Sequence, residues 1–203
     1  MSKKPIIVFE GIEGSGKSHH IKVVSKFLEK NKIKHIKIRE PGGSLNSEKI
    51  RKLILNKKSN FSVKTDLLLY LAARSENINL IKKFYNKKII LIDRFIDSTI
   101  AYQHYGMGVD IKIINIINNY LLKKIKVSFT FLNIVNKRNL FLRLKMRKSL
   151  NRYDQFNANF YNKVQNGFLK LSKLSKKNYK VIDSNLDIKK NEELIINQVK
   201  KLI

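Results

Sequence analysis

The sequence predicts an α/β fold in which a five-stranded parallel sheet is flanked by helices on both faces. Two observations support this fold class. Apolar, β-branched stretches alternate with amphipathic stretches throughout the chain, and a glycine-rich loop joins the first apolar stretch to the first amphipathic one. Because 203 residues suit one domain with a sizeable core, and no linker rich in Pro, Ser or Gly divides them, we expect a single domain over residues 1–203.

The expected elements follow one another in the order that such a sheet requires. We place strands at 6–10, 35–39, 88–92, 127–133 and 179–183, and helices at 17–30, 46–56, 63–84, 110–122, 136–147, 156–176 and 187–202. The first strand is the apolar run from Ile6 to Phe9, and the first helix carries Ile21, Val24 and Leu28 at helical spacing. In such a sheet the functional site lies beyond the C-terminal ends of the strands.

The loop after the first strand fits the phosphate-binding pattern G-x-x-x-x-G-K-[ST]. Its residues are Gly11, Ile12, Glu13, Gly14, Ser15, Gly16, Lys17 and Ser18. Glycine lets the backbone turn with positive φ and point its N–H groups at phosphate oxygens, while Lys17 adds a mobile positive charge and Ser18 offers a hydroxyl to Mg²⁺. The loop therefore predicts a P-loop NTPase fold with nucleotide phosphates bound at this place. The alternative is a glycine-rich turn that holds no ligand.

Arginines follow the second and third strands. Arg39 precedes the rigid turn from Glu40 to Gly43, and the third strand leads into Asp93 and Arg94. Asp93 stands where a P-loop enzyme holds its metal, and a guanidinium suits phosphate because its planar fork donates two hydrogen bonds. We therefore expect a second substrate that carries its own phosphate. The alternatives are a structural Asp-Arg pair at the strand end and a solvent-exposed arginine in the turn.

Two groups of polar and aromatic residues could contact a nucleoside. Tyr70 and Arg74 are four residues apart on the third expected helix and hence on one face, so that one could stack on a base and the other bind its carbonyl. The second group lies within about one helical turn and could read a base edge and pack against a sugar. It consists of Ser98, Thr99, Tyr102 and Gln103. Aromatic residues at helical spacing are more often core residues, so neither group is distinctive alone.

Positive charge gathers over residues 143–154, where the arginines are Arg143, Arg147 and Arg152. Phosphoryl transfer places charge on the oxygens of the transferred group, so a kinase needs cations that arrive with the substrate and exclude water. A mobile basic lid over this segment would supply them. The alternative, in a chain this rich in lysine, is a solvated basic helix end.

Composition limits the partners. The chain has 43 Lys and Arg against 15 Asp and Glu, a formal net charge of +28, which would ordinarily indicate nucleic acid. Lysine greatly exceeds arginine, however, and is spread over the chain together with Ile and Asn, as in a protein from an AT-rich genome, so we expect no nucleic-acid partner. The chain has no cysteine, no signal peptide and no apolar run long enough to span a bilayer, so we expect a cytoplasmic protein without a membrane partner.

Taken in order, these segments resemble the thymidylate kinase family of P-loop nucleoside monophosphate kinases. The matching segments are 9–18, 39–43, 71–74, 93–95, 98–103 and 150–154. The Arg-Glu-Pro-Gly-Gly turn, combined with Asp-Arg before an aromatic residue, separates this family from adenylate and guanylate kinases. The resemblance implies transfer of the γ-phosphoryl group of ATP to dTMP, giving dTDP and ADP for dTTP and DNA synthesis. It also implies Mg²⁺ as the cofactor and a homodimer.

The same resemblance implies the roles of individual residues. ATP would be held by Gly11, Ile12, Glu13, Gly14, Ser15, Gly16, Lys17, Ser18 and Arg143, and its magnesium by Ser18 and Asp93. Arg39 and Arg94 would grip the 5′-phosphate of dTMP, Glu13 would face its 3′-hydroxyl, and the base and sugar would contact Tyr70, Arg74, Thr99, Tyr102 and Gln103. The residues expected to take part in catalysis are Lys17, Asp93, Arg94, Arg147 and Arg152.

Two other functions are compatible with the residues taken alone. A different small-molecule P-loop kinase could act on another nucleotide or on an alcohol, and activity against a panel of monophosphates would identify it. A basic nucleic-acid-binding ATPase is supported only by the net charge, and hydrolysis of ATP stimulated by DNA would indicate it.

Overall fold

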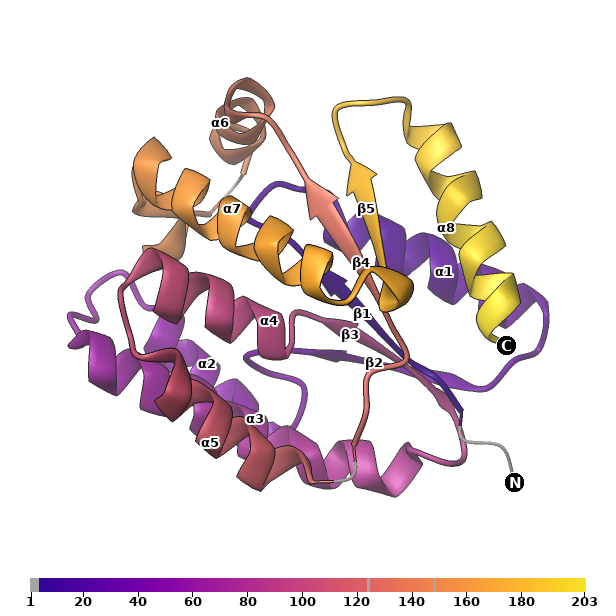
Figure 1. The fold of residues 1–203 in the computed structure, drawn as a ribbon, viewed down its shortest axis with the longest axis horizontal. Coiled ribbons are helices and arrows are strands. Elements are labelled where there is room, and N and C mark those ends of the chain that lie inside the picture. The colour runs from indigo at the N-terminus through magenta and orange to yellow at the C-terminus, as the bar shows by residue number, and fades with distance from the viewer. Residues whose placement is uncertain (1–3, 124, 148) are drawn as a thin grey trace.

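The chain folds around a five-stranded parallel sheet with the strand order β2-β3-β1-β4-β5 (Figure 1). The computed structural model describes residues 4–123, 125–147 and 149–203. The strands are β1 (Ile6–Glu10), β2 (His35–Arg39), β3 (Ile89–Asp93), β4 (Phe129–Ile134) and β5 (Tyr179–Asp183). The fold class predicted from the sequence is therefore confirmed.

The helical elements lie between the strands and after the last one. They are α1 (Lys17–Lys30), α2 (Leu45–Leu55), α3 (Val63–Phe84), α4 (Ile96–Thr99), the π-helical segment η1 (Ile100–Gly106), α5 (Ile111–Leu122), α6 (Lys137–Lys145), the short 3₁₀ turns η2 (Arg152–Gln155) and η3 (Lys176–Asn178), α7 (Ala158–Leu174) and α8 (Ile188–Leu202). In the described residues, none of these helices is both long and apolar enough to cross a membrane.

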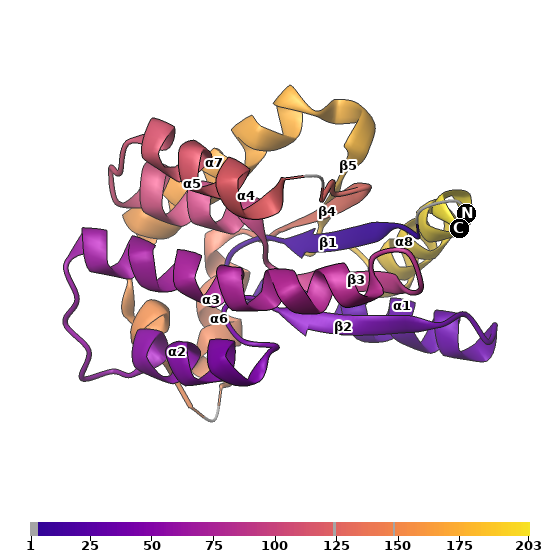
Figure 2. The same cartoon turned by 90° about the horizontal axis from the view of Figure 1, so that it is seen from below.

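Helices cover both faces of the sheet because alternate residues of its strands point to opposite sides. On one face, Ile7 and Phe9 of β1 pack in a core with residues of α1 and α8. On the other face, Ile6 and Val8 pack against α3, and Leu132 of β4 packs against α7 (Figure 1, Figure 2). All five residues of β1 are buried, as expected for the central strand of such a sheet.

Several predicted boundaries were wrong by one or two residues. The expected helices 110–122, 136–147 and 187–202 each begin one residue later, because Asp110, Asn136 and Asp187 are N-caps whose side chains accept a hydrogen bond from the first turn. The expected strand 127–133 is 129–134, because the side chain of Ser128 accepts the hydrogen bond from the N–H of Ile6 in place of a strand carbonyl. The strand expected at 88–92 is 89–93, where it pairs with β1 and β2 up to its last residue.

The largest difference is the segment from Ile96 to Gly106, where the sequence predicts no helix although the residues form α4 and η1. Ile100, Ala101, Tyr102 and Gln103 are all buried, so the segment lacks the polar face that marks an amphipathic helix. α6 ends at Lys145 instead of residue 147, which leaves Arg147 outside the helix. Residues 1–3, 124 and 148, which belong to the predicted domain, lie outside the described residues, and position 148 falls within the predicted lid.

Candidate active site

The phosphate-binding loop joins β1 to α1. Gly11, Gly14 and Gly16 adopt φ values of 135°, 66° and 90°. A Cβ on Gly11 would lie 2.1 Å from the carbonyl oxygen of Asn133, so this position requires glycine for space as well as for conformation. Gly16 is the N-cap of α1, and among the described residues no side chain caps this helix by a hydrogen bond, so its first backbone N–H groups favour an anion.

The side chain of Lys17 folds back across this loop. Its Nζ donates to the carbonyl oxygens of Gly11 and Ile12, at 2.9 and 2.8 Å. Burial lowers the pKa of Lys17 to about 7, and the nearby Arg94 acts in the same direction, while Asp93 opposes them. A phosphate beside Nζ would favour the charged form, so this lysine is suited to an anionic ligand.

Ser18 and Asp93 bring two oxygen donors together at the ends of α1 and β3. Ser18 Oγ donates to Asp93 Oδ2 over 3.3 Å. Mg²⁺ binds oxygen ligands at about 2.1 Å in octahedral geometry, which places neighbouring ligands about 3 Å apart. The two side chains therefore fit adjacent positions around a magnesium ion.

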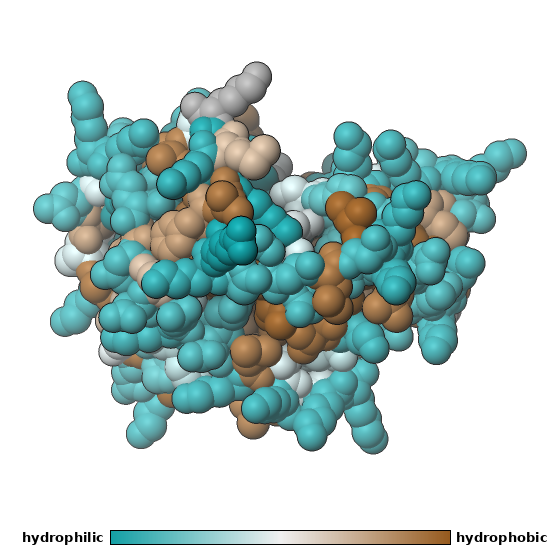
Figure 3. Space-filling model, turned by 90° about the horizontal axis from the view of Figure 1, so that it is seen from above, coloured by the Kyte–Doolittle hydropathy of each residue, from teal (hydrophilic) through white to brown (hydrophobic). Residues whose placement is uncertain are grey.

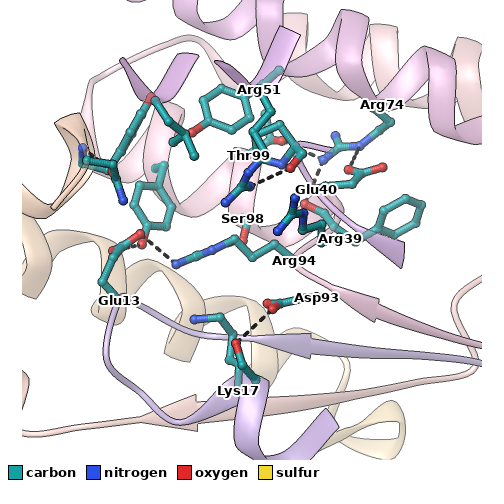
Figure 4. A pocket seen from close by; sticks show the side chains of 18 of the residues that line it. Glu13, Lys17, Arg39, Glu40, Arg51, Arg74, Asp93, Arg94, Ser98 and Thr99 are labelled. Atoms are coloured by element: carbon teal, nitrogen blue, oxygen red, sulfur yellow. Dashed lines mark hydrogen bonds and ion pairs between the residues drawn. The ribbon is translucent and has the colours of Figure 1, made fainter. Parts of the chain in front are cut away.

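A cavity of about 240 Å³ opens beside these residues (Figure 4). The residues predicted for the site that line it are Glu13, Lys17, Ser18, Arg39, Tyr70, Arg74, Asp93, Arg94, Thr99, Tyr102, Gln103 and Arg147. The predicted residues that do not line it are Gly11, Ile12, Gly14, Ser15, Gly16, Arg143 and Arg152. One cavity is thus lined by residues from the start of α1, the end of β3, and helices α3 and α4.

Arg94 lies at the centre of the cavity and has the backbone conformation that glycine usually occupies, with φ of 66°. Its Nη2 donates to Glu13 over 2.8 Å, its Nη1 donates to Ser98 Oγ over 3.3 Å, and its guanidinium lies 5.1 Å from the centre of the Tyr102 ring. Burial works against the charge, but Tyr102, Glu13 and Asp93 together raise the pKa of Arg94. The cavity therefore holds a permanent cation next to the phosphate-binding loop.

Two more guanidinium groups border the same part of the cavity (Figure 4). Arg39 is held by an ion pair with Glu48 of α2, at 2.9 Å, and keeps 54% of its side chain exposed. Arg51 of α2 donates to the carbonyl oxygen of Pro41 over 2.6 Å. Three arginines near one another would hold a phosphate group by charge and by directed hydrogen bonds.

Arg74 lines the cavity at its α3 end and is almost fully buried, with 2% exposed. It forms an ion pair with Glu40 at 2.8 Å and donates to the Thr99 hydroxyl and the Phe95 carbonyl at 2.9 and 2.8 Å. Tyr70, four residues earlier on α3, also lines the cavity, and burial raises the pKa of its hydroxyl. This end of the cavity combines an aromatic ring with directed N–H donors, which suits a heterocyclic base.

The three arginines of the predicted lid have different positions. Arg143 of α6 donates to the carbonyls of Gly14 and Ser184, at 2.8 and 2.7 Å, and so contacts the phosphate-binding loop from outside the cavity. Arg147 lines the cavity and forms an ion pair with Asp154. Arg152 forms an ion pair with Asp66 of α3 and does not line the cavity.

Sequence reasoning missed some residues of the cavity. They are Glu40, Pro41, Arg51, Leu55, Phe95, Asn151 and Tyr153. Five of them belong to the motifs that carry the family resemblance, although the sequence indicates no role for them: Glu40, Pro41, Phe95, Asn151 and Tyr153. Arg51 could have been found from spacing, because it lies four residues after the buried Ser47 and four before Leu55, on the inner face of α2.

Comparisons with known proteins identify the family of the chain. The family model described as thymidylate kinase matches residues 9–195. The thymidylate kinase of Kosmotoga olearia is 31% identical over 194 residues, which cover 95% of this chain and 93% of the relative, and that of Mycoplasma capricolum is 37% identical over 202 residues, covering 97% and 93%. The crystal structure of thymidylate kinase from Ehrlichia chaffeensis superposes with a TM-score of 0.78 at 30% identity, covering 98% of this chain and 99% of that one. The chain therefore belongs to the thymidylate kinase family, the enzymes that phosphorylate dTMP to dTDP.

Proposed function

We propose that the cavity holds ATP and dTMP end to end and transfers the γ-phosphoryl group from one to the other. The observation that carries this proposal is that Lys17 and Ser18 of the phosphate-binding loop open on the same cavity as Arg94. The loop supplies backbone N–H groups and a lysine for the donor phosphates, and the arginine supplies a separate cation for the acceptor phosphate.

On the donor side, residues 11–18 hold the phosphates of ATP, with Lys17 at the β- and γ-phosphates. Arg143 fixes the loop by its bond to Gly14 and contacts the nucleotide from α6. Ser18 and Asp93 hold Mg²⁺, which when bound neutralises part of the phosphate charge.

On the acceptor side, Arg39 and Arg94, together with Arg51, hold the 5′-phosphate of dTMP. Glu13 faces the 3′-hydroxyl of the sugar, and its bond to Tyr102 directs the carboxylate. The base stacks on Tyr70, while its polar edge meets Arg74, Thr99 and Gln103. In support, the Gln103 amide nitrogen is buried and has no hydrogen-bond partner among the described residues, so it can donate to a base.

The chemical step is an in-line displacement. An oxygen of the dTMP phosphate attacks the γ-phosphorus of ATP, the bond from that phosphorus to the β–γ bridging oxygen breaks, and ADP leaves with the electron pair. The ionised acceptor is already a nucleophile, so positioning and charge neutralisation supply most of the acceleration. Residues 143–154 act as a lid in which Arg147 exchanges Asp154 for the transferred phosphoryl group. Arg152 requires a larger movement, away from Asp66.

The substitution Arg94→Ala tests the acceptor assignment. Removing a buried, hydrogen-bonded charge from its partner costs about 2–5 kcal/mol, so kcat/KM for dTMP should fall by about 30- to 4,000-fold. The dissociation constant for ATP should change by less than about threefold, because Arg94 touches the acceptor. Arg138→Ala, at an exposed position of α6, is the control. Unchanged dTMP kinetics in Arg94→Ala would overturn the assignment.

We further propose that two chains associate through α3 and α5, which pack side by side. Their outer faces carry apolar side chains with large exposed fractions: Leu68 (59%), Ile113 (49%), Ile116 (68%) and Tyr120 (73%). An apolar group of this kind favours a protein interface. On the face that Figure 3 shows, hydrophilic side chains predominate around a band of apolar ones. In ultracentrifugation, Ile116→Lys should sediment as a monomer and the unaltered chain as a dimer.

A cytoplasmic location stays a prediction from the sequence.

A further inference from the structure

The guanidinium of Arg74 has one N–H that no acceptor among the described residues uses. Arginine carries five side-chain N–H donors. The Nε–H goes to Glu40, one Nη1–H goes to Asn118, and the two Nη2–H go to the Phe95 carbonyl and the Thr99 hydroxyl, which makes four. The remaining N–H is therefore the second hydrogen of Nη1, the same atom that donates to Asn118.

Asn118 reaches Arg74 from α5 and is not part of the cavity lining. It lies on the inner face of that helix between Ile114 and Leu122, with 3% exposed, and its Oδ1 accepts from Nη1 over 2.7 Å. Because Nη1 and the amide nitrogen are both donors, only the oxygen of Asn118 can face Arg74. Its Nδ2 is consequently buried without a hydrogen-bond partner among the described residues.

This arrangement is unfavourable for stability, since a buried donor without a partner costs free energy that an apolar side chain would not. Packing of α5 against α3 therefore does not explain an amide at this position. The hydrogen bond that Asn118 accepts from Arg74 explains why an amide is present there. The guanidinium is planar, so fixing one hydrogen of Nη1 also fixes the direction of the other.

We propose that Asn118 is a positioning residue that aims the unused Nη1–H of Arg74 at a carbonyl oxygen of the pyrimidine base. The proposal rests on the proposed contact between Arg74 and the base. Glu40 holds Nε, Thr99 and the Phe95 carbonyl hold Nη2, and Asn118 holds Nη1, the nitrogen that keeps the unused hydrogen. Without Asn118, neither hydrogen of Nη1 has an acceptor among the described residues. The guanidinium is then held only along its Nε and Nη2 edge and can tilt about that edge, which moves the Nη1 donor out of line with the base.

The test measures how strongly the enzyme distinguishes a base carbonyl from a thiocarbonyl, a much weaker acceptor. KM is determined for dTMP and for its 2-thio and 4-thio analogues, and the analogue that raises KM in the unaltered enzyme is the probe. Asn118→Leu should raise KM for dTMP by about tenfold, leave KM for ATP within about twofold, and bring the ratio of the probe's KM to that of dTMP close to one. Asn118→Asp keeps an acceptor on Nη1 and should retain the ratio of the unaltered enzyme.

Asn119→Leu is the matched control, because it makes the same change at the next, exposed residue of α5 and should alter neither ratio nor KM. Should Asn118→Leu fail to fold, Asn118→Ala gives the same readout with a smaller side chain. An unchanged ratio in the folded variant overturns the role of Asn118 while leaving the contact of Arg74 with the base intact. If neither thio analogue raises KM in the unaltered enzyme, the base contact itself is refuted, and the role of Asn118 with it.

Discussion

Arg39 and Glu40, which are adjacent at the end of β2, each form an ion pair, and the two pairs should differ greatly in their effect on stability. Glu40 pairs with Arg74 at 2.8 Å, and their side chains are 4% and 2% exposed. Glu48 pairs with Arg39 at 2.9 Å, with 33% and 54% exposed. The chemistry and the distance are nearly equal, so burial is the variable that separates the pairs.

Glu40→Ala leaves the Arg74 charge buried without a counter-ion, which costs about 3–5 kcal/mol. In a chain of this size each kcal/mol lowers the melting temperature by about 2–4 °C, so a fall of about 6–20 °C is expected. Glu48→Ala removes an exposed pair, together with the hydrogen bond from the Gly43 N–H, and should cost about 1 kcal/mol.

Urea unfolding followed by circular dichroism measures both losses of unfolding free energy. A loss below about 1.5 kcal/mol for Glu40→Ala, or equal losses for the two variants, would refute the reasoning. Replacing both members of the buried pair, by Glu40→Leu with Arg74→Met, should recover part of the stability, because the buried charge of Arg74 is then removed together with its partner.

The remaining predictions concern the phosphate-binding loop. Folding lowers the pKa of Lys17 from 10.5 to about 7, so the unfolded chain binds a proton there that the folded chain lacks between these values. Lys17→Met should therefore be more stable than the unaltered chain below pH 7, and this advantage should shrink as the pH rises toward 10. Urea unfolding at pH 6.5 and 9.5 measures it. The same difference in unfolding free energy at both pH values would contradict the prediction. Gly11→Ala, whose Cβ would lie 2.1 Å from the Asn133 carbonyl, should cost about 3 kcal/mol or more, whereas Gly108→Ala, with φ of 80° and no atom within 4 Å, should cost about 1 kcal/mol. Similar losses in chemical denaturation would show that space at Gly11 is not limiting.

The regular part of the fold could be predicted because the spacing of apolar residues along the sequence indicates whether a segment is a helix or a strand. α1 and α3 have the predicted bounds, and β1, β2 and β5 match as well. The segment from Ile96 to Gly106 could not be predicted, because contacts with α3, α5 and α7 bury consecutive residues and remove the periodic pattern. The starts of α5 and α6 were predicted one residue too early, because the sequence alone does not separate the N-cap residues Asp110 and Asn136 from the first residue of each helix.

The candidate site was predictable as far as its residues lie in short motifs. Lys17, Ser18, Asp93 and Arg94 meet because the ends of adjacent parallel strands lie at one edge of the sheet. The positions of Arg143 and Arg152 depend on partners distant in sequence. Arg143 donates to the carbonyls of Gly14 and Ser184, and Arg152 pairs with Asp66, 86 residues away. No local pattern marks such a partner.

The central claim is that two separate cationic groups hold a donor and an acceptor phosphate face to face in one cavity. A crystal structure with a non-hydrolysable ATP analogue, dTMP and Mg²⁺ tests it most directly. We predict Lys17 at the donor phosphates, Arg94 at the dTMP phosphate, and an acceptor oxygen within about 3.5 Å of the γ-phosphorus, in line with the bond that breaks. A dTMP bound elsewhere, or an acceptor oxygen too distant for direct transfer, would contradict the account.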